Sequence, residues 1–192
     1  MNRINLACVA IAVFLGASGA RATTIGFEQF TDSEILTNQI PGLTFSNTIV
    51  LTAGISLNEF EFPPHSGGNV VSDDGAPIVI SFASPVFSFS GFFTYTVPLA
   101  LAGFDSGHHE LASAHSLFSS NLAISGDPGS SPNEFLQIGS IQGISEVDIT
   151  GAVQGGSFAM DDISSSVPEP RSAFFLLAGL AALLAGRKRK PA

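Results

Sequence analysis

The segment Val86-Phe87-Ser88-Phe89-Ser90 alternates apolar or aromatic side chains with serine. Successive side chains of a β-strand point to opposite faces, so a period of two is typical of a strand with one buried face. Around this segment lie short β-type runs separated by Gly, Pro, Ser, Asn and Asp, and no run has a convincing helical period. The predicted strands are Thr24–Phe30, Leu43–Thr52, Pro77–Phe82, Val86–Tyr95, Leu99–Phe104, Leu117–Ile124, Glu134–Ile138, Ser145–Thr150 and Gly156–Ile163. This spacing predicts an all-β fold, an antiparallel β-sandwich over residues 23–166.

The composition allows one domain with a substantial core, because 45% of the 192 residues are apolar and only 12% are charged. Most of the phenylalanines lie within residues 23–166. Phenylalanine has no polar group, so most of these rings are expected in a dry core. Phe60, Phe62 and Phe118 are expected at loop edges, where an exposed ring could stack on a ligand.

The charge distribution excludes one class of partner. All 16 acidic residues lie between Glu28 and Glu169, and residues 23–170 contain no Lys or Arg. Nucleic-acid binding is excluded because phosphate groups are bound by Lys and Arg, and anionic lipid headgroups are disfavoured for the same reason. A surface that carries only carboxylates favours cations such as calcium, which prefers hard oxygen ligands.

The N-terminal segment has the three parts of a secretory signal peptide. Arg3 gives a basic start, Ile4–Leu15 is an apolar run, and the small-residue end contains Ala20 and Ala22 in an A-x-A arrangement. Residues 1–22 are therefore predicted to be a signal peptide that signal peptidase removes after Ala22.

The C-terminal segment, residues 167–192, also has three parts. A motif at 167–171 precedes a predicted membrane helix at 172–186, whose apolar segment is Ala173–Ala185, and a basic end at 187–190. The motif is Val167-Pro168-Glu169-Pro170-Arg171 and the basic end is Arg187-Lys188-Arg189-Lys190. A helix of some fourteen apolar residues covers only ~21 Å of a hydrocarbon core that is ~30 Å thick, so the anchor is marginal. The positive-inside rule leaves the basic end in the cytoplasm and the acidic domain outside.

This tail resembles the PEP-CTERM sorting signal of Gram-negative bacteria that make exopolysaccharide. Pro168, Glu169 and Pro170 match the motif positions of that signal, and the resemblance covers roughly the last 26 residues. It implies transient anchoring in the inner membrane. It also implies cleavage near the motif by an exosortase, a membrane cysteine protease and transpeptidase. The expected destination is the cell surface or the extracellular space.

The end of the domain carries a second resemblance. The stretch Gly155-Gly156-Ser157-Phe158-Ala159-Met160-Asp161-Asp162-Ile163 is similar to the last strand of jelly-roll, galactose-binding-like domains. The resemblance implies a jelly-roll-like sandwich in which Asp161 or Asp162 joins Glu28 of the first strand around a structural calcium ion. Such an ion would connect the first and last strands.

Two other groups of polar residues are open to more than one interpretation. Asp73 and Asp74 precede Gly75, and Asp-Gly is a common turn dipeptide, so a turn is the preferred interpretation and a ligand site the alternative. The histidine cluster His108-His109-Glu110 with His115 matches no metal-binding motif and is interpreted as a solvated loop.

Three functional hypotheses follow. No Gly-x-Ser-x-Gly elbow is present and no carboxylate pair is singled out, so the chain is predicted not to be an enzyme. The preferred hypothesis is an exported, non-catalytic protein of the cell envelope or extracellular matrix, associated with exopolysaccharide or biofilm. The alternative is a calcium-assisted, lectin-like carbohydrate-binding module. The third hypothesis is a glycan-processing enzyme.

Overall fold

The computed structural model describes residues 22–166, and within this range the chain forms ten β-strands and no helix. The strands are β1 (Ala22–Ile25), β2 (Ile35–Leu36), β3 (Leu43–Ser46), β4 (Thr48–Thr52), β5 (Asn69–Asp73), β6 (Ile78–Tyr95), β7 (Ala100–Phe104), β8 (Glu110–His115), β9 (Glu134–Thr150) and β10 (Phe158–Ser166). The rest of the predicted signal peptide and the predicted sorting tail lie outside the described residues. Within residues 22–166 there is no helix long and apolar enough to cross a membrane.

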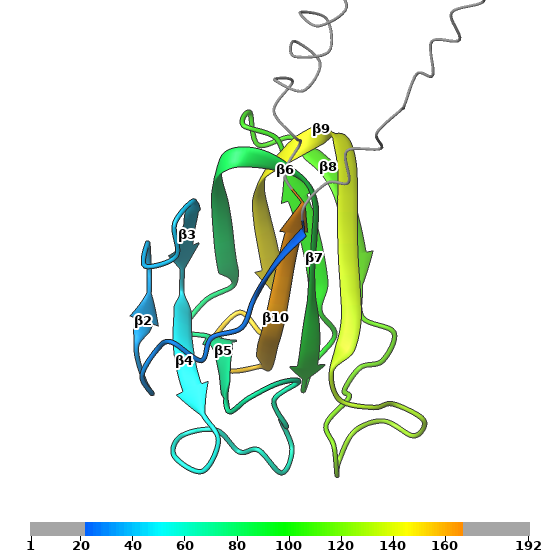
Figure 1. Ribbon diagram of the computed structural model, residues 1–192. Coiled ribbons are helices and arrows are strands. Elements are labelled where there is room, and N and C mark those ends of the chain that lie inside the picture. Colours follow the sequence, from blue (N-terminus) through cyan, green and yellow to red (C-terminus); the bar gives the residue numbers. More distant parts are fainter. Residues whose placement is uncertain (1–21, 167–192) are drawn as a thin grey trace, which may run out of the picture.

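The strands form one antiparallel sheet that folds over on itself into two layers (Figure 1). The strand order is β2-β4-β5-β10-β6-β9-β7-β8, with β1 paired to β10 and β3 paired to β6. The long strands β6 and β9 belong to both layers. Up to Val86, β6 pairs with the second half of β9, and up to Phe82 also with β3; from Ser88 it pairs with β10 and the first half of β9. The predicted antiparallel all-β architecture is confirmed.

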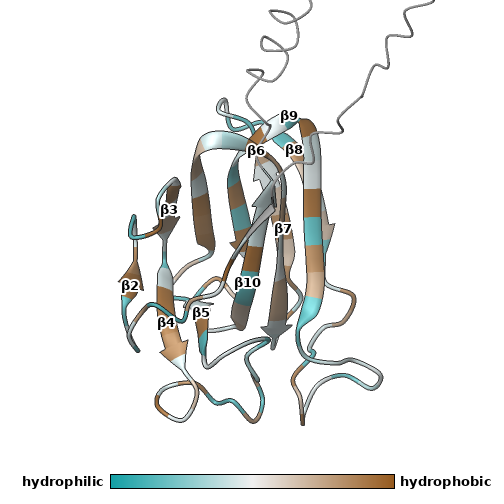
Figure 2. Ribbon diagram, in the orientation of Figure 1, coloured by the Kyte–Doolittle hydropathy of each residue, from teal (hydrophilic) through white to brown (hydrophobic). Residues whose placement is uncertain are grey.

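The core lies between the two layers and is lined mainly by aromatic and branched side chains. Along β9 hydrophobic and hydrophilic residues alternate, as expected for a strand with one face in the core (Figure 2). Phe89 is buried, whereas Phe87 is 39% exposed. The alternation at 86–90 therefore does not place both rings on one buried face. The reason is a register shift between Val86 and Ser88, a bulge that bends β6.

Some predicted strands differ from those observed. The prediction of a strand at Leu117–Ile124 is wrong: this segment is a loop, and β7 lies between β8 and β9. Pro77–Phe82 and Val86–Tyr95 fall in the single strand β6, as the two predicted strands between 134 and 150 fall in β9. The predicted strand Leu43–Thr52 divides into β3 and β4 at Asn47, whose φ of 55° lies in the left-handed region. β5 was missed because all five of its residues are buried, which leaves no alternation to detect.

Candidate functional site

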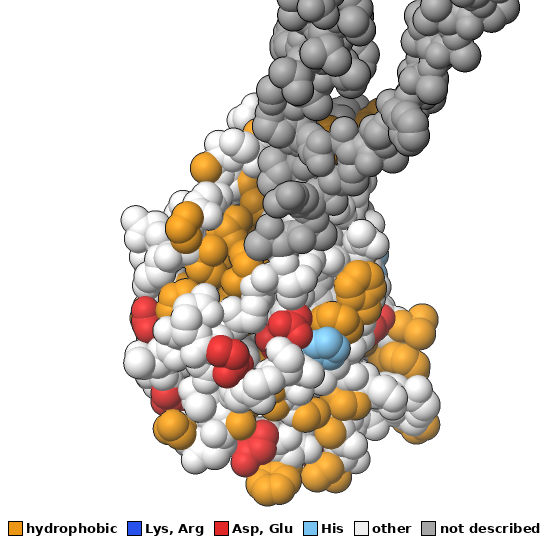
Figure 3. Space-filling view, viewed as in Figure 1, with side chains coloured by type: hydrophobic (Ala, Val, Ile, Leu, Met, Phe, Trp, Pro, Cys, Tyr) orange, Lys and Arg blue, Asp and Glu red, His pale blue; other side chains and the backbone are white. Residues whose placement is uncertain are grey.

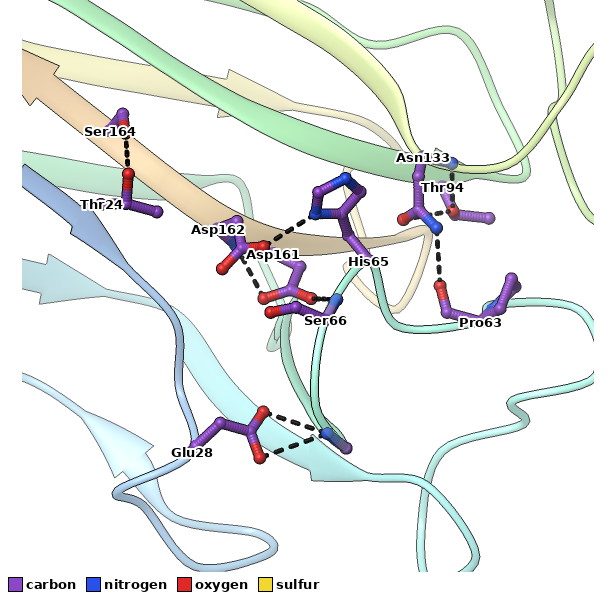
Figure 4. A network of polar contacts seen from close by, with 11 residues as sticks. Thr24, Glu28, Pro63, His65, Ser66, Thr94, Asn133, Asp161, Asp162 and Ser164 are labelled. Carbon is purple, nitrogen blue, oxygen red and sulfur yellow. Dashed lines mark hydrogen bonds and ion pairs between the residues drawn. The ribbon is translucent and has the colours of Figure 1, made fainter.

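Midway along its length, strand β10 changes its partner on one edge. Ala159 and Met160 pair with β5, and from Ile163 onwards the same strand pairs with β1. Asp161 and Asp162 lie between the two partners, where the register with β6 shifts and Asp162 has a φ of 46°. The loop that leads into β5 lies over this change of partner strand. Carboxylates from both ends of the domain contact that loop (Figure 4).

Asp161 is the buried member of this group. One carboxylate oxygen, Oδ2, accepts a hydrogen bond from the N–H of Ser66 at 2.8 Å, and Oδ1 accepts one from the N–H of Asp162 at 2.7 Å. Burial raises the pKa of Asp161 above its ordinary value, and the two N–H donors partly offset this effect. A raised carboxyl pKa means that the contribution of this group to stability falls as the pH rises through that pKa. The hydrogen bonds from the N–H groups of Ser66 and Asp162 stabilise the charged form of this buried carboxyl group.

Asp162, at the point where β10 changes its partner strand, binds the aromatic side chain of His65. The Nδ1–H of His65 donates to Oδ2 of Asp162 at 2.7 Å. The ring of His65 stacks on Phe92 of β6, with centroids 3.5 Å apart and planes 8° from parallel. Phe92 in turn lies 5.3 Å from the ring of Phe135 on β9. One carboxylate thus holds the first of three neighbouring rings in place.

Glu28, which follows β1, approaches the loop from the other side. Its carboxylate accepts hydrogen bonds from the N–H groups of Gly68 and Asn69, the latter at 2.9 Å. A Cβ on Gly67 would lie 2.3 Å from this carboxylate, and Gly67 has a φ of 56°, so the position requires glycine. The amide of Asn69 donates to the carbonyl oxygens of Phe27 and Phe30, which fixes the turn that carries Glu28.

The three residues predicted to bind calcium, Glu28, Asp161 and Asp162, thus lie around one loop. Their carboxylates accept hydrogen bonds from N–H groups of the chain, and among residues 22–166 no group of three or more His, Cys, Asp or Glu side chains is arranged to hold a metal ion. A calcium ion would have to share these carboxylates with their N–H donors or displace those donors. The calcium site remains a prediction.

Beyond the three rings, the outer face of β10, β6 and β9 continues with uncharged polar side chains. Paired residues of antiparallel strands point to the same side, so Phe92 and Phe135 share a face with the next pair, Ser90 and Gln137, and Ser90 also pairs with Ser164. Phe135 is 51% exposed. We refer to His65, Phe92, Phe135, Gln137 and Ser164 as the ring face. Figure 3 views the molecule from the side of β1 and β10, where acidic groups and a histidine lie beside hydrophobic side chains.

The fold is similar to that of solved adhesin and carbohydrate-binding domains. The K2 cleaved adhesin domain of Lys-gingipain is 12% identical, with a TM-score of 0.49 over 77% of this chain and 100% of that one. A DUF4465 family protein from Bacteroides caccae is 10% identical, with a TM-score of 0.48 over 77% and 100%. A family 6 carbohydrate-binding module is 12% identical, with a TM-score of 0.37 over 70% and 92%. No protein-family model matches the sequence, and no curated protein is significantly similar to it.

Similarity at these identities and TM-scores says nothing about binding, so the function has to be argued from the side chains of this chain. Of the three rings expected at loop edges, Phe60 is 71% exposed, whereas Phe62 and Phe118 are partly buried against the core clusters. His108 lies next to Glu146, with Nδ1 and Oε1 3.3 Å apart, and its ring stacks on Phe104.

Sequence reasoning missed the ring face itself. Phe92 and Phe135 were counted among the core rings, and His65 follows two prolines without any motif. Their partners come from β6, β9 and the loop before β5, so only the strand pairing brings them together. The one available signal was the uncharged polar residues that alternate along β9 after Phe135.

Proposed function

We propose that residues 23–166 form a non-catalytic, jelly-roll-like module that binds a neutral polysaccharide on the ring face, and that the protein is exported to the cell envelope or extracellular matrix. The observation that carries this proposal is the half-exposed ring of Phe135 next to Phe92 and His65, followed along the strands by hydroxyl and amide groups. The hydrogen bond between His65 and Asp162 fixes the ring of His65 in its stack on Phe92.

The chemistry of this face suits a sugar. A pyranose ring has apolar C–H faces that pack on aromatic rings and a rim of hydroxyl groups that need hydrogen-bond partners. Gln137 offers both an amide donor and a carbonyl acceptor, and Ser164 offers a hydroxyl. The hydroxyl of Thr24 on β1 is 2.8 Å from that of Ser164, which extends the polar row across a third strand.

The charge of the domain narrows the class of polysaccharide. Residues 22–166 contain no Lys or Arg to pair with uronate, sulfate or phosphate groups. An acidic glycan would be repelled by the carboxylates of Asp162 and Glu28 beside the ring face. A neutral glycan is therefore the expected ligand.

Delivery to that ligand depends on the two ends of the chain. The basic, apolar and small-residue parts of residues 1–22 support export, and the motif 167–171 followed by an apolar segment and a basic end supports sorting by an exosortase. The module would then be held transiently at the inner membrane and released to the cell surface or the extracellular space, where exopolysaccharide and biofilm matrix occur.

The first prediction concerns the exposed ring. Replacing Phe135 with alanine removes the stacking surface, and since aromatic contacts contribute about 1 kcal/mol beyond area burial, the affinity for polysaccharide should fall roughly five- to tenfold. The measurement is isothermal titration or affinity electrophoresis with neutral polysaccharide from an exopolysaccharide-producing bacterium. Leu117→Ala is the control, because Leu117 is 78% exposed and lies in a loop outside the ring face.

Equal binding by the Phe135→Ala and Leu117→Ala variants would place the glycan site elsewhere. Absence of binding by the unmodified domain to any neutral polysaccharide would overturn the lectin-like role and leave an exported structural protein.

Calcium is a second candidate for the same region, because Glu28, Asp161 and Asp162 surround one loop. If the ion binds, a concentration of 100 times its dissociation constant stabilises the domain by about 2.7 kcal/mol. Millimolar calcium should therefore raise the melting temperature, and Asp162→Asn should reduce the rise, whereas exposed Asp74→Asn should not. Identical melting curves in calcium and in chelator would show that no calcium binds here. The loop N–H groups and His65 would then be the groups that stabilise the charges of these carboxylates.

A further inference from the structure

The end of the molecule where the chain enters β1 and leaves β10 carries a second feature. Ala22 and Ser166 are paired residues, so the two ends of the described chain lie side by side (Figure 1). Ser166 also pairs with Ser88 of β6, with the two hydroxyl oxygens 2.7 Å apart, and Ser88 pairs with Gly139 of β9. The chain therefore leaves the sheet directly beside the bends of β6 and β9.

These bends form an exposed apolar surface, which we call the terminal tip and define as residues 84–88 and 139–142. A shallow hollow on it is lined by Phe87, Gly139, Ser140 and Ile141. Ile141 is 95% exposed. The two segments contain no charged residue, although the domain is strongly acidic. A fully exposed isoleucine beside an exposed phenylalanine, at the point where both ends of the domain emerge, indicates a contact surface.

The sequence beyond Ser166 determines what can reach this surface. Six residues, 167–172, separate Ser166 from the apolar run that starts at Ala173. Six extended residues span at most about 20 Å. With the apolar run in a bilayer, the terminal tip is held next to the lipid surface at an effective concentration in the millimolar range, where even a weak contact is populated.

We propose that the terminal tip rests on the lipid surface while the chain is anchored, with Ile141 and Phe87 between the headgroups. This inference rests on the sorting-tail part of the proposed function and is independent of glycan binding. Zwitterionic lipids are the expected partner. Residues 22–166 offer no Lys or Arg to anionic headgroups, and the neighbouring loop between β7 and β8 carries Asp105.

This contact would also fix the orientation of the ring face. Phe92 lies four residues along β6 from Ser88, and four residues of strand span ~13 Å. Phe92 and its partner Phe135 would be raised above the headgroups, with the outer face of β10, β6 and β9 standing along the membrane normal. A polysaccharide could then reach the rings from the side without meeting the bilayer.

The test uses residues 23–192, the chain expected after removal of the signal peptide, reconstituted in phosphatidylcholine vesicles. Cys8 is the only cysteine and lies in the removed segment, so single labelling sites can be introduced directly. Ile141→Cys and Phe60→Cys are labelled with a polarity-sensitive fluorophore, and quenching by a nitroxide on the lipid headgroup is measured. Phe60 is the matched control, because it is 71% exposed in the loop between β4 and β5, at the opposite end of the molecule (Figure 1).

The label at 141 should be quenched at least threefold more than the label at 60, and deletion of residues 167–192 should abolish the difference. Equal quenching of the two labels on vesicle-bound protein would overturn the inference while leaving the anchor intact. Failure of residues 23–192 to float with vesicles would overturn the anchor and the inference together, without affecting glycan binding. A third result is that the fluorescence of the label at 141 shifts in detergent but is not quenched by the lipid nitroxide. That result would mean that the C-terminal tail covers the terminal tip, and it would also overturn the proposal.

Discussion

Replacing Asp73 with alanine should lower the free energy of unfolding by about 3 kcal/mol or more, while the same change at its neighbour Asp74 should have almost no effect. Asp73, the last residue of β5, is only 2% exposed, whereas Asp74 is exposed. Its Oδ1 accepts hydrogen bonds from the N–H groups of Ser157 and Phe158 at 2.9 and 3.2 Å, and Oδ2 accepts one from the Ser157 hydroxyl at 2.8 Å.

The size of the effect follows from what the substitution leaves behind. Alanine removes every hydrogen bond to this carboxylate and leaves the two buried backbone N–H groups of Ser157 and Phe158 without a partner. An unsatisfied buried donor costs about 1–3 kcal/mol. Since a domain of this size loses ~3 °C of melting temperature per kcal/mol, the melting temperature should fall by roughly 10 °C.

Thermal unfolding of Asp73→Ala and Asp74→Ala, measured by circular dichroism on residues 23–166, checks this expectation. Asp73→Asn adds a graded comparison, because its carbonyl oxygen can still accept from the N–H of Ser157, and its loss should be smaller. Equal melting temperatures for the two alanine variants would show that the hydrogen bonds between Asp73 of β5 and the start of β10 contribute little to stability.

Asp73 also illustrates what sequence reasoning could and could not reach. Asp73 and Asp74 were interpreted as part of a turn, but only Asp74 and Gly75 lie in the connection between β5 and β6, with Gly75 at a φ of 77°, whereas Asp73 is the last residue of β5. Asp73 has its partners 84 and 85 residues away on the chain, in a stretch that the sequence alone does not bring near it. Local patterns predict turns and strand faces, whereas a buried polar contact depends on the pairing of whole strands.

The same distinction applies to the rest of the fold. Most strands were predictable, because their apolar alternation follows from burial of one face. Asp161, Asp162 and Glu28, which the resemblance of residues 155–163 to a jelly-roll strand links through calcium, all contact the loop at 65–69, and the calcium site itself stays a prediction. The bulge within β6 between Val86 and Ser88 was not predictable, and it turns Phe87 outward into the terminal tip. His65 was missed because it acts through a stack on Phe92, 27 positions further along the chain.

The second large loss of stability is expected in the loop at 117–124, the segment wrongly predicted to be a strand. One buried side chain of this loop holds it in place. Asn121 is fully buried, and its Oδ1 accepts a hydrogen bond from the N–H of Tyr95 at 2.6 Å. Its Nδ2 donates to the carbonyl oxygens of Phe93 and Ser131 at 2.8 and 3.1 Å. The amide thus makes the hydrogen bonds that a neighbouring strand would otherwise make to the end of β6.

Asn121→Ala should therefore destabilise the domain by about 3 kcal/mol, since it leaves a buried N–H and two carbonyl oxygens without their partner and opens a cavity. The control is Asn58→Ala, because Asn58 is exposed in the loop between β4 and β5. Hydrogen exchange adds a local measurement: the amide of Tyr95 should lose protection in the Asn121 variant before the centre of β6 does. If its exchange rate does not change, the loop is held by its other contacts. If it does change, ligand affinity should fall as well, because β9 enters the ring face at Phe135 directly from this loop.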